Sequence, residues 1–182
     1  MNTYRMRTLK TALFAAAWLA SGYGMADAAL LHVRKTIVIN APADKVWAAA
    51  SNFDGLNTWH PAVAKDVIVD GTNNTVGAVR LLTLQDGGTI KEKLLAFDAA
   101  EHRFRYAIVE GVLPVSHYTA SFAVKSVDSG NASVTWSGRF KRKDLGPTPA
   151  NNADDKTAVD TIQGVYQAGL DNLKKVVETA GK

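Results

Sequence analysis

Apolar and polar residues alternate along most of the chain between residues 31 and 140. Val33, Ile37 and Ile39 share one face of an extended segment, because successive side chains of a strand point to opposite sides. The same period of two recurs six more times, interrupted by turn sequences such as Asp86-Gly87-Gly88. The pattern predicts seven strands, over residues 31–39, 63–69, 76–84, 89–97, 104–108, 118–124 and 134–140.

Helical spacing appears in two short stretches after the first strand and in one long stretch at the end. Pro42 suits the first position of a helix, Asp44 suits its first turn, and a second short turn is expected over residues 56–59. From residue 154 or 155 to residue 177, apolar positions recur over about six turns. Such a helix needs a broad apolar partner, and an antiparallel sheet with one apolar face supplies it. The predicted fold is of the α+β class: a seven-stranded curved antiparallel sheet wrapped around a long C-terminal helix.

The N-terminus has the layout of an export signal. Basic residues precede a mostly apolar stretch over residues 9–20, and Ala26-Asp27-Ala28 is a small-x-small cleavage site. This predicts a signal peptide over residues 1–28, cleavage after Ala28, and one mature periplasmic domain over residues 29–182. The apolar stretch is short for a membrane span, so we expect no stable membrane anchor after cleavage, with an uncleaved anchor as the alternative.

Charge and composition argue against several function classes. Of the 21 basic and 17 acidic residues, three and one lie in residues 1–28, which leaves a net charge of +2, too small to predict nucleic-acid binding. The one basic run, between Arg139 and Lys143, is interpreted as a solvated strand end. There is no cysteine, the four histidines lack metal-ligand spacing, and no nucleotide-binding glycine motif occurs. We therefore expect neither a metal nor a cofactor.

Three segments resemble a known superfamily. They are residues 36–47 (TIVINAPADKVW), residues 57–63 (NTWHPAV), and the middle of the sheet with residues 92–94 (EKL) and 111–118 (GVLPVSHY). With the order of elements, they are similar to the START-like superfamily, also called SRPBCC, of polyketide cyclases and Bet v 1-like proteins. The resemblance covers residues 31–180 and implies a helix-grip fold. It also implies that Asp86-Gly87-Gly88 and residues 111–115 are loops at the mouth of a cavity.

Exported members of the superfamily narrow the resemblance further. The chain looks most like the MxaD type, an accessory protein associated with periplasmic methanol oxidation. That likeness implies an alternative function, assisting electron transfer between a periplasmic dehydrogenase and its cytochrome, with those proteins as partners. Because the superfamily also contains cyclases, an enzyme of cyclase or hydratase type is a third hypothesis.

The leading hypothesis is a non-catalytic protein that holds a small hydrophobic molecule between sheet and helix. Glu92 shares a strand face with Leu94, so it is expected to point inward as a polar anchor. Its alternatives are a structural ion pair with Arg80 or, in the enzyme hypothesis, proton transfer together with a tyrosine.

Aromatic residues supply the other polar contacts in this hypothesis. Tyr106 and Tyr118 each combine an apolar body with a polar tip, which suits ligand orientation, and ordinary core packing is their alternative, as it is for Trp136. Trp59 is expected near the mouth of the cavity, with a packing role as its alternative. No catalytic residue is predicted. The candidate ligand-binding residues are Trp59, Glu92, Tyr106, Ile108, Leu113, Tyr118 and Trp136.

Overall fold

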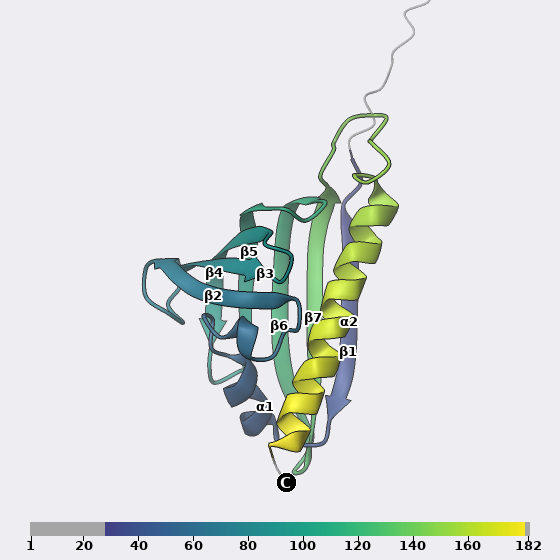
Figure 1. The fold of residues 1–182 in the computed structure, drawn as a ribbon. Coiled ribbons are helices and arrows are strands. Elements are labelled where there is room, and N and C mark those ends of the chain that lie inside the picture. The colour runs from purple at the N-terminus through teal and green to yellow at the C-terminus, as the bar shows by residue number, and fades with distance from the viewer. Residues whose placement is uncertain (1–27, 181–182) are drawn as a thin grey trace, which may run out of the picture.

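The computed structural model describes residues 28–180, so the predicted signal peptide lies outside the described residues apart from Ala28. Seven strands form one curved antiparallel sheet in the order β1-β7-β6-β5-β4-β3-β2, which confirms the predicted fold class (Figure 1). The strands are β1 (Leu31–Ile39), β2 (Val63–Asp70), β3 (Val79–Leu84), β4 (Thr89–Asp98), β5 (Arg103–Gly111), β6 (Val115–Asp128) and β7 (Asn131–Arg142).

The helices connect and cover this sheet. The helix α1 (Ala43–Ala50) and the short η1 (Leu56–Thr58) carry the chain from β1, at one edge, to β2, at the other. Successive antiparallel pairings then return the chain until β7 pairs with β1. The helix α2 (Asp155–Thr179) lies along β7 and β1 (Figure 1). Within residues 28–180, none of the helices combines the length and the apolar character that a membrane crossing requires.

The core lies between the inner face of the sheet and the buried stripe of α2. Asp154 caps α2, since its side chain accepts a hydrogen bond of 2.7 Å from the backbone N–H of Thr157. In β7 every second residue is buried, and the inward positions include Trp136 and Gly138. The stripe that α2 turns toward the sheet consists of Ala158, Ile162, Tyr166, Gly169, Leu170, Leu173 and Val177.

Two glycines let bulky side chains approach the backbone closely. A Cβ atom at Gly138 would collide with the hydroxyl of Tyr166. A Cβ atom at Gly169 would lie 2.6 Å from Cδ2 of His60 and 2.9 Å from Cζ3 of Trp136. The absence of a side chain at these two positions therefore sets how closely α2 packs against the sheet and against the segment after η1.

The short turn expected over residues 56–59 is the 3-10 turn η1, which ends one residue earlier. Two other local expectations were wrong. The strand expected from residue 76 begins at Val79, because Gly77 has a left-handed φ of 98°, which is incompatible with a strand. Arg142 does not belong to a solvated strand end. It is buried, and its guanidinium donates to Asp155 Oδ1 at 2.9 Å and to the carbonyl of Gly146 at 2.8 Å.

Candidate ligand-binding cavity

A cavity of about 70 Å³ lies between the sheet and α2. The free volume is small because buried side chains from both layers fill most of the space between them. The structure places six of the seven predicted site residues around this cavity: Glu92, Tyr106, Ile108, Leu113, Tyr118 and Trp136. The lining is completed by Leu56, His60, Ala62, Val63, Leu82, Leu84, Ile90, Ile162 and Val165.

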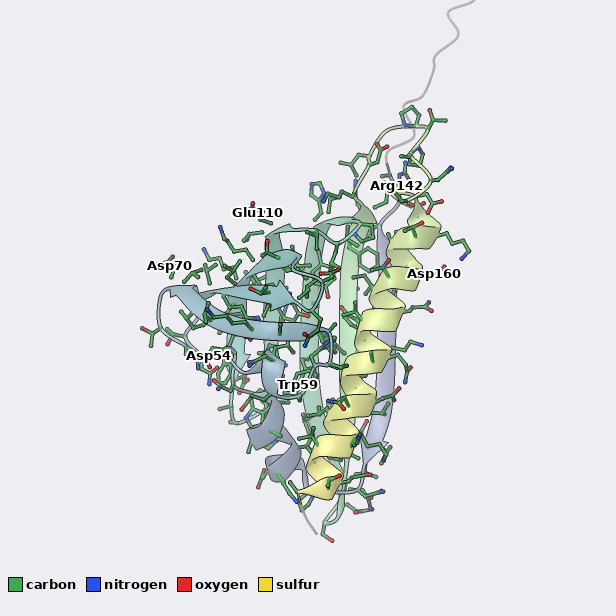
Figure 2. The ribbon with its side chains drawn as sticks, viewed as in Figure 1. Asp54, Trp59, Asp70, Glu110, Arg142 and Asp160 are labelled. Atoms are coloured by element: carbon green, nitrogen blue, oxygen red, sulfur yellow. The ribbon has the colours of Figure 1, made fainter. Side chains whose placement is uncertain are left out.

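Trp59 does not lie at the mouth of the cavity, so the expected position was wrong. Its side chain is 3% exposed, and its ring lies 5.8 Å from the ring centroids of both Phe122 and Trp136. The side chain of Asn172 on α2 donates a 2.8 Å hydrogen bond to the carbonyl of Trp59. Trp59 therefore packs in the core and fastens the segment after η1 to α2 (Figure 2).

His60, the next residue, lines the cavity instead. Its Nε2 lies 3.1 Å from the carbonyl of Val165, and its Nδ1 accepts a 3.2 Å hydrogen bond from the backbone N–H of Ala62. These partners fix the tautomer with hydrogen on Nε2. Burial lowers the pKa of the imidazole below its ordinary value, so His60 is neutral at pH 7.

The tyrosines join in a buried chain of hydroxyl groups beside the cavity. Trp136 Nε1 donates to the hydroxyl of Tyr106 at 2.9 Å, which lies 3.4 Å from the hydroxyl of Tyr118. That group in turn lies 2.5 Å from the hydroxyl of Tyr166 on α2. Burial raises the pKa of all three tyrosines, so they keep their protons at neutral pH. The apolar stripe of the last helix had placed Tyr166 in the core, but no sequence signal identified its hydroxyl partner.

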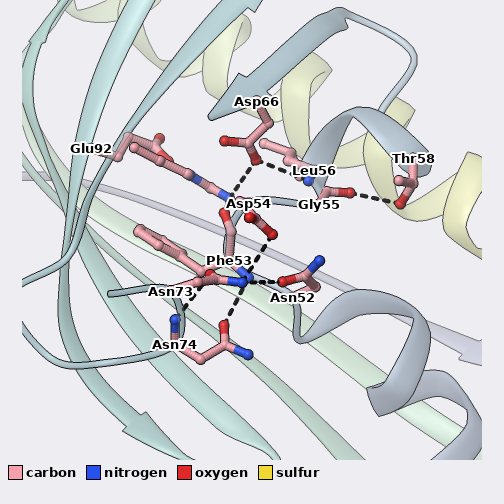
Figure 3. Close-up of polar contacts among 11 residues, drawn as sticks. Asn52, Phe53, Asp54, Gly55, Leu56, Thr58, Asp66, Asn73, Asn74 and Glu92 are labelled. Atoms are coloured by element: carbon pink, nitrogen blue, oxygen red, sulfur yellow. Dashed lines mark hydrogen bonds and ion pairs between the residues drawn. The ribbon is translucent and has the colours of Figure 1, made fainter. Parts of the chain in front are cut away.

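Glu92 forms the buried ion pair with Arg80 that the sequence had left as an alternative. Arg80 donates from Nε at 2.8 Å and from its terminal nitrogen Nη2 at 2.6 Å, and both bonds reach Oε2 of Glu92. The second terminal nitrogen of Arg80, Nη1, donates to the carbonyl of Phe53 at 2.6 Å and lies 3.3 Å from Oδ2 of Asp66. One buried cation thus serves two carboxylates, those of Glu92 and Asp66 (Figure 3). Glu92 also lines the cavity.

Asp66 is the weaker carboxylate partner of Arg80 and was missed at the level of sequence. Its Oδ2 accepts a 3.0 Å hydrogen bond from the backbone N–H of Leu56, which positions η1, whereas its Oδ1 is buried without a partner among the described residues (Figure 3). Burial raises the pKa of Asp66 from 3.8 to about 6. Burial also raises the pKa of Glu92, against the opposing effect of Arg80.

The ion pair and the tyrosines bear on the enzyme hypothesis. Burial raises the pKa of Glu92 at the wall of the cavity, while Arg80 favours its charged form. The tyrosine hydroxyls keep their protons and bond to one another, so they can act as acids and not as bases. In the enzyme hypothesis, Glu92 is therefore the group that accepts a proton. No group of three metal-ligating side chains occurs within the part of the chain that the structure describes.

The segments at one end of the cavity touch one another. Leu84, at the end of β3, and Leu113, between β5 and β6, both line it. A Cβ atom at Gly88 would lie 3.0 Å from Cγ2 of Val112, so the β3–β4 turn rests against the loop after β5. Lys143 holds that loop from the other side, with a 3.1 Å hydrogen bond from Nζ to the carbonyl of Gly111.

A curved sheet gripping a long helix, with an apolar cavity between them, defines a hydrophobic-ligand-binding fold. Residues 31–178 match the family described as polyketide cyclase / dehydrase and lipid transport, and the chain belongs to that family. The match confirms the superfamily that the sequence resembles. None of the curated protein sequences matches this chain significantly.

Solved structures agree with this assignment. The chain is 27% identical to the protein XoxI from Bacillus cereus, with a TM-score of 0.71 over 83% of this chain and 98% of that one. It is also 27% identical to a protein from Nitrosospira multiformis, with a TM-score of 0.67 over 80% and 94% of the two chains. The Zhui aromatase/cyclase from Streptomyces sp. R1128 is 20% identical, with a TM-score of 0.69 over 85% and 97%, and shares the fold.

Proposed function

We propose that the protein binds one small, mostly apolar molecule that carries a hydrogen-bonding group, in the cavity between the sheet and α2. The observation that carries this proposal is the position of Glu92. Arg80 takes up only Oε2 of this carboxylate, while the residue lies in the wall of an otherwise largely apolar cavity. A ligand donor that reaches the carboxylate from the cavity gains a charge-assisted hydrogen bond.

The volume of the cavity limits the size of that molecule. An apolar cavity of about 150 Å³ accommodates benzene, and typical ligand pockets measure about 300–1,000 Å³. The cavity here measures about 70 Å³, so a ring-sized ligand must displace the side chains at its mouth. Leu113 is suited to move, because it lies in the loop between β5 and β6 and is only partly buried.

The site of action in this proposal is the periplasm. The basic start, the apolar stretch over residues 9–20 and the cleavage site ending at Ala28 support export and processing. Mass spectrometry of the protein recovered from a periplasmic fraction tests this directly. The expected mature chain begins at Ala29, and an intact N-terminus in the membrane fraction would contradict it.

Thermal unfolding with a panel of phenols and short alcohols tests ligand binding. A molecule that binds only the folded state raises the unfolding temperature. Ile108→Phe fills the cavity and removes this rise, whereas Val109→Phe, at a 54% exposed neighbour, leaves it intact. No rise with any panel member, or an equal rise in Ile108→Phe, would overturn the proposal.

The small cavity supports a second candidate function, an MxaD-like accessory role between a periplasmic dehydrogenase and its cytochrome. If the interior holds no ligand, the outer surface carries the function. A basic surface with Arg34, Arg105 and Arg139, on the face of the sheet opposite α2, is available for a partner. Affinity purification from the periplasm at low salt, followed by mass spectrometry, tests this candidate. It predicts recovery of a dehydrogenase or a cytochrome, and recovery of neither would contradict it.

A further inference from the structure

The outer face of the sheet, opposite α2, carries a basic hollow built from four neighbouring strands. The hollow has a volume of about 390 Å³. Pairing aligns Arg34 on β1 with Ser137 on β7, Ser137 with Ser121 on β6, and Ser121 with Arg105 on β5. Arg139 lies in the adjacent row, where its register partners are His32 and Thr119.

The arginines of this hollow are exposed and without acidic partners. Arg34, Arg105 and Arg139 form no ion pair with any carboxylate in residues 28–180. The acidic side chains of the neighbouring strands are already engaged: Asp98 pairs with Arg103 at 3.2 Å, and Glu110 pairs with Lys91 at 3.4 Å. Three guanidinium groups therefore face solvent on one side of the molecule.

The residues between the arginines form the floor of the hollow and have short side chains, several of which carry hydroxyl groups. Ser121 and Ser137 share a 2.9 Å hydrogen bond between their hydroxyls, and the other floor positions are Thr119, Ala120 and Gly138. Strands lie about 4.8 Å apart, so the backbones that carry Arg34 and Arg105 are about 14 Å apart. That width suits a helix or strand of a partner, since a helix with its side chains is about 10–12 Å across. It is much larger than the diameter of one small ion.

We propose that this outer basic hollow docks an acidic segment of a partner protein, whose carboxylates meet Arg34 and Arg139 on one side and Arg105 on the other. Guanidinium groups bind carboxylates in a two-pronged geometry, and a complementary patch accelerates association. The floor offers hydroxyls and no large apolar side chain for insertion into a lipid surface. The inference does not depend on the inner cavity being occupied, so failure of ligand binding there leaves it standing.

Fluorescence anisotropy with a labelled oligoglutamate peptide tests the proposal, at low and at physiological salt. We expect salt-sensitive binding that weakens at least about tenfold in the triple variant R34Q/R105Q/R139Q. The matched triple K45Q/K65Q/K175Q removes the same charge from exposed positions off the hollow. It should bind within about twofold of the wild type. The charge-preserving triple R34K/R105K/R139K separates guanidinium geometry from charge. Its affinity should lie between those of the wild type and R34Q/R105Q/R139Q.

Several outcomes would overturn the proposal. If K45Q/K65Q/K175Q loses as much affinity as the arginine triple, attraction by net charge explains the binding. If a DNA duplex or phosphatidylglycerol vesicles bind more tightly than oligoglutamate through the same arginines, the occupant is wrong. Absence of oligoglutamate binding at low salt also contradicts it. Equal unfolding temperatures of the variants show that the changes act on the surface alone.

Discussion

The hydroxyl of Tyr166 occupies the space that a side chain at position 138 needs, and this makes Gly138→Ala an informative change. The collision involves one atom, because the next nearest neighbours of an added Cβ, Thr119 O and Tyr118 Cε2, lie at 3.5 Å, an ordinary contact. Gly138 does not have a positive φ, so alanine fits its backbone conformation. The penalty therefore comes from Tyr166 and is removed when that hydroxyl is removed.

The size of the effect of Gly138→Ala follows from two contributions. Alanine in place of glycine at a compatible position stabilises a protein by about 0.4–1 kcal/mol through the unfolded chain. Overpacking a filled core costs about 1–3 kcal/mol. We expect Gly138→Ala to lower the free energy of unfolding by about 1–2 kcal/mol. Tyr166→Phe alone removes the 2.5 Å hydrogen bond to Tyr118 and costs about 1 kcal/mol.

The double variant gives the decisive value. In Gly138→Ala/Tyr166→Phe the collision is absent, so its stability should equal or slightly exceed that of Tyr166→Phe. Urea unfolding followed by tryptophan fluorescence should give a favourable coupling of about 1–3 kcal/mol. Gly130→Ala, in an open turn, is the control and should combine additively with Tyr166→Phe. Additivity within about 0.5 kcal/mol for the Gly138 pair would refute the packing argument.

Three further predictions concern close packing and the buried ion pair beside the cavity. Gly169→Ala should destabilise the protein by about 1–3 kcal/mol in thermal or urea unfolding, because its Cβ would meet His60 and Trp136. The control Gly164→Ala has open space around it and should stabilise the protein by up to about 1 kcal/mol. Equal effects of the two changes would count against close packing at Gly169. Arg80→Met should lower the free energy of unfolding by about 3–5 kcal/mol at neutral pH and by less at acidic pH, since it leaves Glu92 and Asp66 buried without their cation. A decrease below about 1 kcal/mol at neutral pH, measured by urea unfolding, would show that the carboxylates are not buried charges. The pKa of Asp66 is raised from 3.8 to about 6, so the unfolded chain releases this proton at lower pH than the folded chain does. The contribution of Asp66 to stability therefore falls by up to about 3 kcal/mol as pH rises from about 4 to about 6. Asp66→Asn should lack this part of the pH dependence of stability, and identical stability profiles of the variant and the wild type would disprove it.

The period of two in the apolar residues was sufficient to predict the sheet, and their helical spacing was sufficient to predict the long helix. In β7, for example, the period of two correctly placed Val134, Trp136 and Phe140 on the inner face. The boundaries that failed depend on backbone geometry rather than on side-chain pattern. Gly77 is an example, since its left-handed φ delays β3 although the alternation begins earlier.

Contacts between distant residues explain what the sequence could not show. The ring of Trp59 packs against Phe122 and Trp136 from distant strands, and the adjacent His60 fits because position 169 lacks a side chain. The pairing of Glu92 with Arg80 could be predicted as an alternative, because a hairpin signal lies between the two strands that carry these residues. The third member, Asp66, enters from the preceding strand, and the residual volume of the cavity depends on the packing of every wall at once.

The outer basic hollow was also beyond the sequence pattern. Its arginines are single residues on β1, β5 and β7, and only the strand order β1-β7-β6-β5 brings them to one face. The basic run that the sequence displays divides between two environments. Arg139 joins the hollow, whereas Arg142 turns inward to bind the loop before α2.

The central claim is that the space between the sheet and α2 admits a small apolar molecule. Titration of the isoleucine-methyl-labelled protein with phenol, followed by NMR, tests it most directly. Ile90, Ile108 and Ile162 line the cavity, whereas Ile39 is fully buried elsewhere in the core. The account predicts saturable shifts of the three lining methyl groups and none at Ile39. Absence of shifts at the lining residues, or shifts of similar size at all buried isoleucines, would contradict it.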